Sequence, residues 1–244
     1  MRKYLNRTVG NIMTWPFLLL SLLLLSGCDD ERCIKGEGDV ERRTLQLQPF
    51  SDVEANGDFK VYITQGATQQ VEVRGQPNIL DQVNTQVSNG RWKITHDDCV
   101  RRSKEVEVYI TMPEVKGLAV NGSGSISGEN KFTATELPVY VNGSGSIDLE
   151  LEASKVITRV TGSGKVHMGG TTKVHSINMS GSGSVAAFNL AAEDVTINIS
   201  GSGDAEVEAS HSLTVDISGS GKVYYVGNPA VSSNISGSGK VVKK

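Results

Sequence analysis

The chain has 244 residues, with 27 Asp and Glu against 24 Lys and Arg, which gives a formal net charge of −3 at pH 7. A mildly acidic chain lacks the basic face that nucleic-acid binding needs, so we exclude nucleic acid as a partner. Seven of its tripeptides read Gly-Ser-Gly. Small uncharged residues supply few groups for catalysis, so their repetition indicates a structural role first.

The N-terminal segment has the pattern of an export signal. Arg2, Lys3 and Arg7 precede an apolar run over residues 17–25, which is shorter than the about 20 residues of a membrane span. The sequence "LLSGC" resembles the lipobox of bacterial lipoproteins, and this implies that residues 1–27 are removed and that Cys28 carries a lipid. The alternative is an ordinary secretory signal. Removal of residues 1–27 would change the formal charge from −3 to −6, because three basic residues and no acidic residue are lost.

Residues 28–43 are rich in charge and glycine, which predicts a tether between the lipid and the folded domain. Asp29 resembles the signal that some bacteria use for retention at the inner membrane, whereas other bacteria do not read it. The sequence therefore leaves two locations open, the outer membrane or cell surface and the periplasmic face of the inner membrane.

Two cysteines remain if Cys28 is acylated. An oxidising envelope compartment would allow Cys33 and Cys99 to form a disulfide, which would tie the tether to the domain. The alternative is two unrelated thiols.

Residues 44–117 predict an irregular β cap. Apolar residues alternate with polar ones over residues 59–63, 70–74, 91–95 and 105–111, as in half-buried strands. Between them, Ile79, Leu80, Val83 and Val87 have helix-like spacing, so we expect one short helix or a helical turn.

From residue 118 to residue 244 the chain repeats, with the Gly-Ser-Gly triplets 18 to 21 residues apart. This period predicts a solenoid in which each coil buries its apolar side against its neighbours. The pattern within each unit is β throughout, and a coil of about 19 residues would hold three short strands and three turns. Parallel crossovers are right-handed, so we predict an all-β fold, a right-handed parallel β-helix.

Alternation of side chains assigns each repeat position to a face. The residues two before and four after the first glycine are apolar in all seven units, so these columns, and with them both glycines of each triplet, are expected to face inward. The triplet serines then form an outward ladder with about 4.8 Å per coil. This ladder is our candidate ligand face, and it consists of Ser123, Ser144, Ser163, Ser182, Ser202, Ser220 and Ser238.

Two further outward ladders are predicted beside it. One lies directly before the triplets and contains Asn121, Asn142, Thr161, Ser180, Ser200, Ser218 and Ser236. The other lies two residues earlier and includes Asn178, Asn198, Asp216 and Asn234.

The stretch "FSDVEANGDFKVYITQG" resembles the opening of the head GIN domain family, an adhesin-like domain of unknown function. Phe50, Val53, Gly57, Phe59 and Val61 stand where that family has them, and Pro113 and the Gly-Ser-Gly repeats match its later part. The resemblance covers residues 44–244. It implies a parallel β-helix in exported or lipid-anchored bacterial envelope proteins, and it supplies no catalytic residues.

Few residues are candidates for catalysis or metal binding. An enzyme on a β-helix would need paired carboxylates, and the candidates are Glu150 and Glu152 in one coil and Asp204, Glu206 and Glu208 in another. We interpret these as solvated surface charge. His167, His175 and His211 occupy different repeat positions, which favours exposed single histidines over a metal site. We therefore expect no catalytic residue, no metal and no cofactor.

Binding needs less than catalysis, so it remains the expected role. We expect a non-catalytic, lipid-anchored envelope protein that acts as an adhesin-like binder or forms a surface structure, with a glycan or an envelope protein as its partner. The alternatives are a periplasmic scaffold or sensor partner at the inner membrane and a polysaccharide-active enzyme. The sequence leaves the oligomeric state open.

Overall fold

The computed structural model describes residues 33–244, so the predicted signal segment 1–27 and Cys28 lie outside the described residues. Strands make up most of the described chain, and 17 of them join in one sheet. No helix in this part of the chain is long and apolar enough to cross a membrane.

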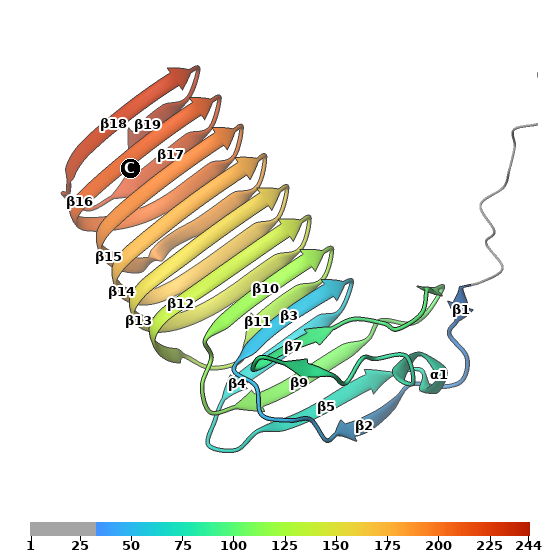
Figure 1. Cartoon of the computed structure of the whole chain (residues 1–244). Helices are drawn as coiled ribbons and strands as arrows, with labels where there is room; N and C mark the ends of the chain where they lie inside the picture. The colour runs from blue at the N-terminus through green and yellow to red at the C-terminus, as the bar shows by residue number, and fades with distance from the viewer. Residues whose placement is uncertain (1–32) are drawn as a thin grey trace, which may run out of the picture. The chain divides into compact units, whose positions relative to one another are not determined.

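The repeats form a stack of coils in which each strand pairs in parallel with the strand one repeat later (Figure 1). The prediction of a right-handed parallel β-helix is confirmed. The strands of the stack are β10 (Gly117–Gly122), β11 (Ser125–Gly128), β12 (Phe132–Gly143), β13 (Ser146–Gly162), β14 (Lys165–Gly181), β15 (Ser184–Gly201), β16 (Asp204–Gly219), β17 (Lys222–Val226), β18 (Ala230–Gly237) and β19 (Lys240–Lys243).

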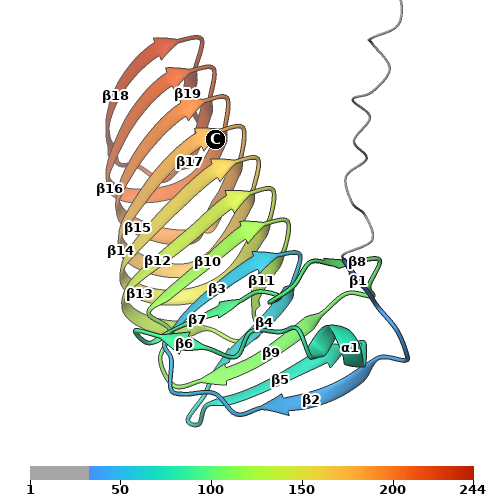
Figure 2. The same ribbon diagram turned by 45° about the vertical axis from the view of Figure 1, so that its right-hand side comes forward.

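Each coil is built differently from the expected three short strands. In the middle of the stack, β13 to β16 are single strands of 16 to 18 residues, and a triplet turn joins each to the next. The chain therefore reverses twice per coil, once sharply at the triplet and once by bending within a continuous strand (Figure 2). Between the triplets the repeats contain few breakers, so nothing in the sequence ends the strand there.

Differences in repeat length are absorbed away from the triplets. The register between β15 and its neighbours shifts near Gly169 and Asn189 and again near Ala192, where bulges accommodate extra residues. All triplet-side pairs, such as Ser180 with Ser200, stay aligned from coil to coil.

The core lies inside the coils and includes the two predicted apolar columns. Val141 and Val160, two before the first glycine, and Val166 and Val185, four after it, are almost fully buried. Ile235 belongs to the same column but is 39% exposed, because β18 lies at the edge of the described stack. Burial of these columns supplies the main stabilisation of the stack, at about 25 cal/mol for each Å² of apolar surface.

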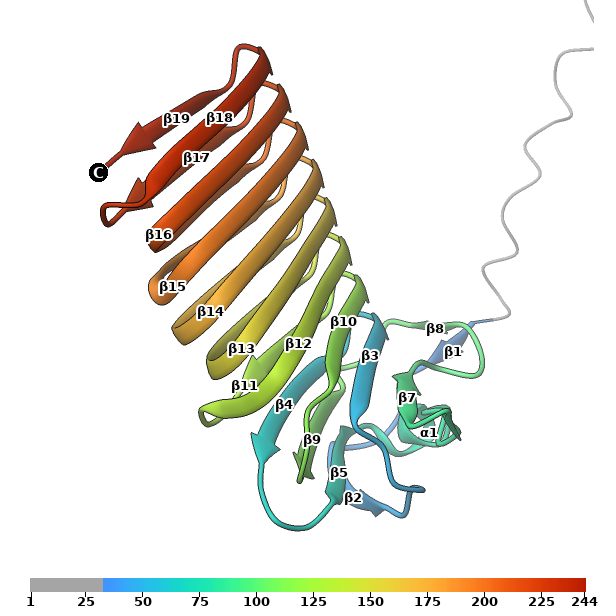
Figure 3. The same cartoon turned by 60° about the vertical axis from the view of Figure 1, so that its left-hand side comes forward.

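The N-terminal part closes the other end of the stack (Figure 3). It contains β1 (Ile34–Lys35), β2 (Glu41–Leu45), β3 (Asp52–Gly57), β4 (Lys60–Gln65), β5 (Gln70–Gly75), β6 (Val87–Ser88), β7 (Arg91–Ile94), β8 (Val100–Arg101) and β9 (Glu107–Met112). Strands β5 and β2 pair antiparallel at its outer side. Of the helix-like run, only one turn is helical, α1 (Pro77–Leu80), whereas Val83 forms a bridge and Val87 lies in β6.

The parallel pairing begins before the first Gly-Ser-Gly triplet. Strand β3 pairs with β10, and Gly57 stands opposite Gly122, while β4 pairs with β11. In this first coil, Asp58 and Phe59 take the places of the serine and the second glycine. The buried Phe59 stacks on His96 of the cap, with the ring centroids 4.5 Å apart, where the regular coils end.

Candidate binding face

The triplets form one edge of the stack, and backbone groups hold that edge in register. The N–H of Ser202 donates to the carbonyl of Gly181 at 2.9 Å, and Ser182 and Ser220 make the equivalent bonds to the preceding coil at 2.8 Å. The seven triplet serines are exposed at the turn, as predicted.

The two glycines of a triplet have different structural roles. The prediction that both face inward is wrong for the first glycine. Gly201 has a φ of +127°, and a Cβ there would lie 2.4 Å from the carbonyl oxygen of Gly181 in the preceding coil. The first glycine is therefore required by a left-handed turn and by close backbone approach along the stack. The second glycine is buried, and a Cβ on Gly203 would meet the inward side chain of Met179 at 2.8 Å.

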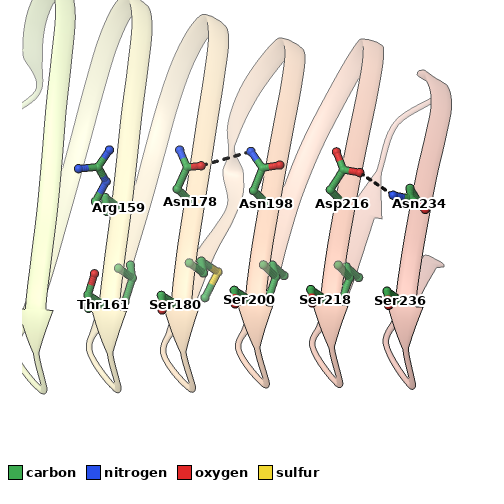
Figure 4. A pocket seen from close by; sticks show the side chains of 14 residues that line it. Arg159, Thr161, Asn178, Ser180, Asn198, Ser200, Asp216, Ser218, Asn234 and Ser236 are labelled. Carbon is green, nitrogen blue, oxygen red and sulfur yellow. Dashed lines mark hydrogen bonds between the residues drawn. The ribbon is translucent and has the colours of Figure 1, made fainter.

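A groove of about 440 Å³ runs across the coils beside this edge, between the two outward columns that precede the triplets. We call it the ladder groove. Figure 4 shows its two rows of side chains, one with Arg159, Asn178, Asn198, Asp216 and Asn234 and the other with Thr161, Ser180, Ser200, Ser218 and Ser236. Each row places one polar side chain per coil, in register from β13 to β18.

Hydrogen bonds between neighbouring coils order the first row. Asn198 donates through Nδ2 to Asn178 Oδ1, and Asn234 donates to Asp216 Oδ1, both at 3.2 Å (Figure 4). Arg159 is the last residue of this row that lines the groove, and its guanidinium lies 5.5 Å from the ring centroid of Tyr140 in the preceding coil. Among residues 33–244, no carboxylate lies within salt-bridge distance of Arg159.

The candidate serines of the triplets do not line this groove. The polar residues that line it stand in the columns of the other two ladders, which the alternation of the sequence had already placed outward, and residues of the inward column such as Met179 lie between them. Arg159 and Tyr140 belong to the same column as Asn178, and counting three residues back from each triplet would have found them.

A family described as "putative auto-transporter adhesin, head GIN domain" matches residues 49–229. The chain belongs to this family. None of the curated proteins matches the sequence.

Solved structures share the fold of this head GIN domain. A "putative adhesin" from Bacteroides fragilis is 25% identical with a TM-score of 0.82, and the match covers 86% of this chain and 100% of that one. A "putative lipid binding protein" from Parabacteroides distasonis is 24% identical with a TM-score of 0.72, covering 87% and 100% of the two chains. A "putative adhesin" from Parabacteroides merdae is 18% identical with a TM-score of 0.71, covering 87% and 99%.

A second groove of the head GIN domain, of about 550 Å³, lies at the bend opposite the triplets and collects carboxylates. Glu152, Glu193 and Glu208 line it together with Lys173. Glu152 and Glu208 share one column but stand three strands apart, about 14 Å at the usual strand spacing. The two carboxylates of a glycosidase lie closer together, at about 5 to 10 Å. Glu150, Asp204 and Glu206 do not line this groove.

The histidines do not form a metal site within residues 33–244, where no group of three His, Cys, Asp or Glu side chains could hold a metal ion. His167 and His211 are exposed and pair with Asp148 and Asp194 at 3.1 and 2.7 Å. The interpretation of His175 as exposed is wrong. It is fully buried in the column of Val156, and its Nε2 lies 2.9 Å from Thr158 Oγ1. Burial disfavours the charged ring and lowers the pKa of His175 to about 4.

The two candidate disulfide cysteines lie where the tether meets the N-terminal strands. Cys33 and Cys99 are both disulfide-bonded in the structure. Next to them β1 pairs with β8, and the N–H of Ile34 donates to the carbonyl of Cys99 at 2.8 Å. The tether and the cap are thus also joined through the backbone.

Proposed function

We propose that this protein is a lipid-anchored, non-catalytic binding protein of a bacterial cell envelope and that it holds an extended polar ligand in the ladder groove. The observation that carries the proposal is the regular presentation of one hydroxyl or carboxamide group per coil in two parallel rows. A ligand with its own regular repeat could meet the same group at each step of about 4.8 Å.

The energetics of the groove suit weak contacts made many times. An exposed hydroxyl or amide contributes only about 1 kcal/mol through a hydrogen bond, because water competes for the same group. Several such groups held in register by the sheet lose little side-chain freedom when they bind, so their contributions add. The exposed triplet serines extend this polar surface past the edge. The membership in an adhesin family supports the same role.

The lipid anchor is the second part of the proposal and rests on the sequence "LLSGC", with Cys28 as the acylated residue. It would hold the domain at the membrane through a shorter tether than residues 28–43, because Ile34–Lys35 and Glu41–Leu45 form β1 and β2 and pair with strands of the cap. A surface location fits adhesion, and Asp29 motivates the competing role of a scaffold at the inner membrane.

Protease shaving of intact cells tests the location, with Cys28→Ala as the unanchored control. Digestion of the domain from outside supports adhesion at the surface. Protection until the outer layer is breached would contradict surface adhesion and favour the periplasmic role.

An array of immobilised linear oligosaccharides, built from neutral, N-acetylated and uronic-acid sugars, tests the groove. We expect the domain to be retained and Asn198→Ala to weaken retention. The matched control is Asn189→Ala, an exposed asparagine of the same strand outside the groove. Equal retention of both variants would show that the groove does not bind.

A further inference from the structure

The first row of the ladder groove continues toward the N-terminal end as far as an aromatic ring. Register places Tyr140 beside Arg159 on one side and beside Ala119 on the other, and Glu54 follows Ala119. Because Ala119 has only a methyl group, an opening remains between Tyr140 and Glu54, whose strands are about 10 Å apart. A pocket of about 150 Å³ lies here.

The two faces of the Tyr140 ring therefore have different surroundings. The Arg159 guanidinium covers one face at 5.5 Å from the ring centroid and holds the ring in place. The other face is directed toward the small side chain of Ala119 and borders the pocket. Tyr140 is half-buried and lines the pocket, so the ring face that Arg159 leaves open is the one available to a ligand.

Polar groups surround that accessible face. Asn121 and Asn142 line the pocket on the side of the triplets, and Asn142 donates to Asn121 at 2.9 Å. On the far side, Glu54 accepts from Asn121 at 3.0 Å and lies 3.6 Å from Arg91. The pocket thus combines one apolar ring face with both donors and acceptors at its rim.

This combination of an apolar ring face and a polar rim matches the chemistry of a sugar. The assignment rests on the proposed function, the binding of an extended polar ligand in the ladder groove. A pyranose ring has an apolar C–H face and a rim of hydroxyl groups. An aromatic ring face with a few fixed polar groups around it is complementary to both. We propose that the pocket over Ala119 is a sugar-binding subsite, with Tyr140 stacking on one pyranose ring of a glycan that continues into the ladder groove.

The strands beneath the pocket argue against an extended peptide as the occupant. Strand β10 is paired with both β3 and β12, so its backbone donors and acceptors are already used. A peptide could not add as a strand here, because that mode of recognition needs a free sheet edge. Recognition must come from side chains alone, which suits a polyhydroxylated ligand.

Four other aromatic rings among residues 33–244 have partners of their own. Trp92 is fully buried, and its indole N–H donates to the carbonyl of Asn84 at 2.9 Å. Tyr224 lies under the ammonium group of Lys244 at 4.6 Å. Tyr62 and Tyr109 stack on each other, with ring centroids 5.0 Å apart.

The test uses the same oligosaccharide array and three variants of the full domain. We expect Tyr140→Ala to reduce retention about tenfold, the loss of about 1.4 kcal/mol. Ala119→Leu should do the same by filling the pocket, whereas Tyr140→Phe keeps the ring and should bind within twofold of the parent. Ala186→Leu is the matched control, since Ala186 is a half-buried outward alanine that lines neither this pocket nor the ladder groove.

The outcomes separate this subsite from the proposed function. If Asn198→Ala weakens retention while Tyr140→Ala and Ala119→Leu do not, the groove binds glycans and the subsite is overturned. If the parent retains no oligosaccharide but does retain members of a peptide array, both proposals are overturned. Thermal unfolding followed by circular dichroism checks that each variant is folded.

Discussion

The two edges of the coils reverse the chain by different means. At the triplet edge, the first glycine takes a positive φ and the carbonyl of the preceding coil lies directly beside it, as at Gly201 and Gly181. At the opposite bend, the strand continues through the turn, and bulges near Gly169 and Ala192 change the register. The close approach of backbone to backbone recurs at all seven triplets, whereas at the opposite bend it occurs in single coils, at Gly170 and Gly227. The triplet edge therefore leaves no room for a change of length, and the bulged bend can absorb one.

Among the substitutions, the largest expected effect comes from Gly201→Val. The new side chain would combine a strained φ with a contact 2.4 Å from the Gly181 oxygen, so we expect a loss of about 3 kcal/mol or more in the free energy of unfolding. Urea denaturation measures it. Thr196→Val in the same strand, at an exposed position, is the control. If the Gly201→Val protein were as stable as the control, the first glycine would not be required at the triplet edge.

A similar loss is expected on acidification, because His175 lies just past the bend with its ring buried. Its folded-state pKa of about 4 is below the ordinary value of 6.5, so the unfolded chain binds the proton more tightly. Stability should be full above pH 6.5 and should fall as the pH approaches 4, by roughly 3 kcal/mol in total.

The double variant His175→Val with Thr158→Val isolates this effect. It removes both members of the buried hydrogen bond and leaves no unpaired polar group. Urea denaturation between pH 7 and pH 4 should give a flatter profile for this variant than for the parent. Parallel profiles would assign the acid sensitivity to other groups.

A smaller effect is expected from deletion of Asn189, an exposed residue at the bulge in β15. Ala187 and Leu190 both face inward with two residues between them, so the deletion restores simple alternation. We expect a change within about 1 kcal/mol in the free energy of unfolding. Deletion of Ser202 is the comparison and should prevent folding, because it breaks the register of the triplet edge. Similar costs for both deletions would contradict the difference between the edges.

The smallest effect is expected from Ser202→Ala. Its hydroxyl is exposed, and the bond that holds the turn comes from its backbone N–H, which alanine keeps. The melting temperature should shift by no more than the change that corresponds to about 0.5 kcal/mol. A clear loss of stability would show that the serine ladder supports the turn through its side chains.

The sequence was sufficient to predict the parallel β-helix, because a fixed period and two apolar columns are visible along the chain. It was also sufficient for the outward ladders, since alternation alone separates Asn178 from Met179. The first coil was missed because Gly57-Asp58-Phe59 replaces the triplet there. The burial of His175 was within reach of the sequence, because it stands six residues before Gly181 and alternation places even offsets from the first glycine inward.

The pocket at Tyr140 could be predicted only in part. Ala119 and Tyr140 each stand three residues before a triplet, so the repeat places them side by side, whereas Glu54 joins them through the pairing of β3 with β10, in the coil that has no triplet. Nothing in the sequence marks Ala119 as a site residue, because it contributes no chemical group. Its small side chain matters because it leaves space beside the ring of Tyr140.

The register of the triplet edge has a consequence for how such a surface can change over time. Since every coil docks on its neighbours through the same backbone bonds, duplication of one repeat would lengthen both rows of the ladder groove by about 4.8 Å without disturbing the rest. The number of repeats then sets the length of ligand that the ladder groove can hold, and single substitutions in the rows change the chemistry of the groove.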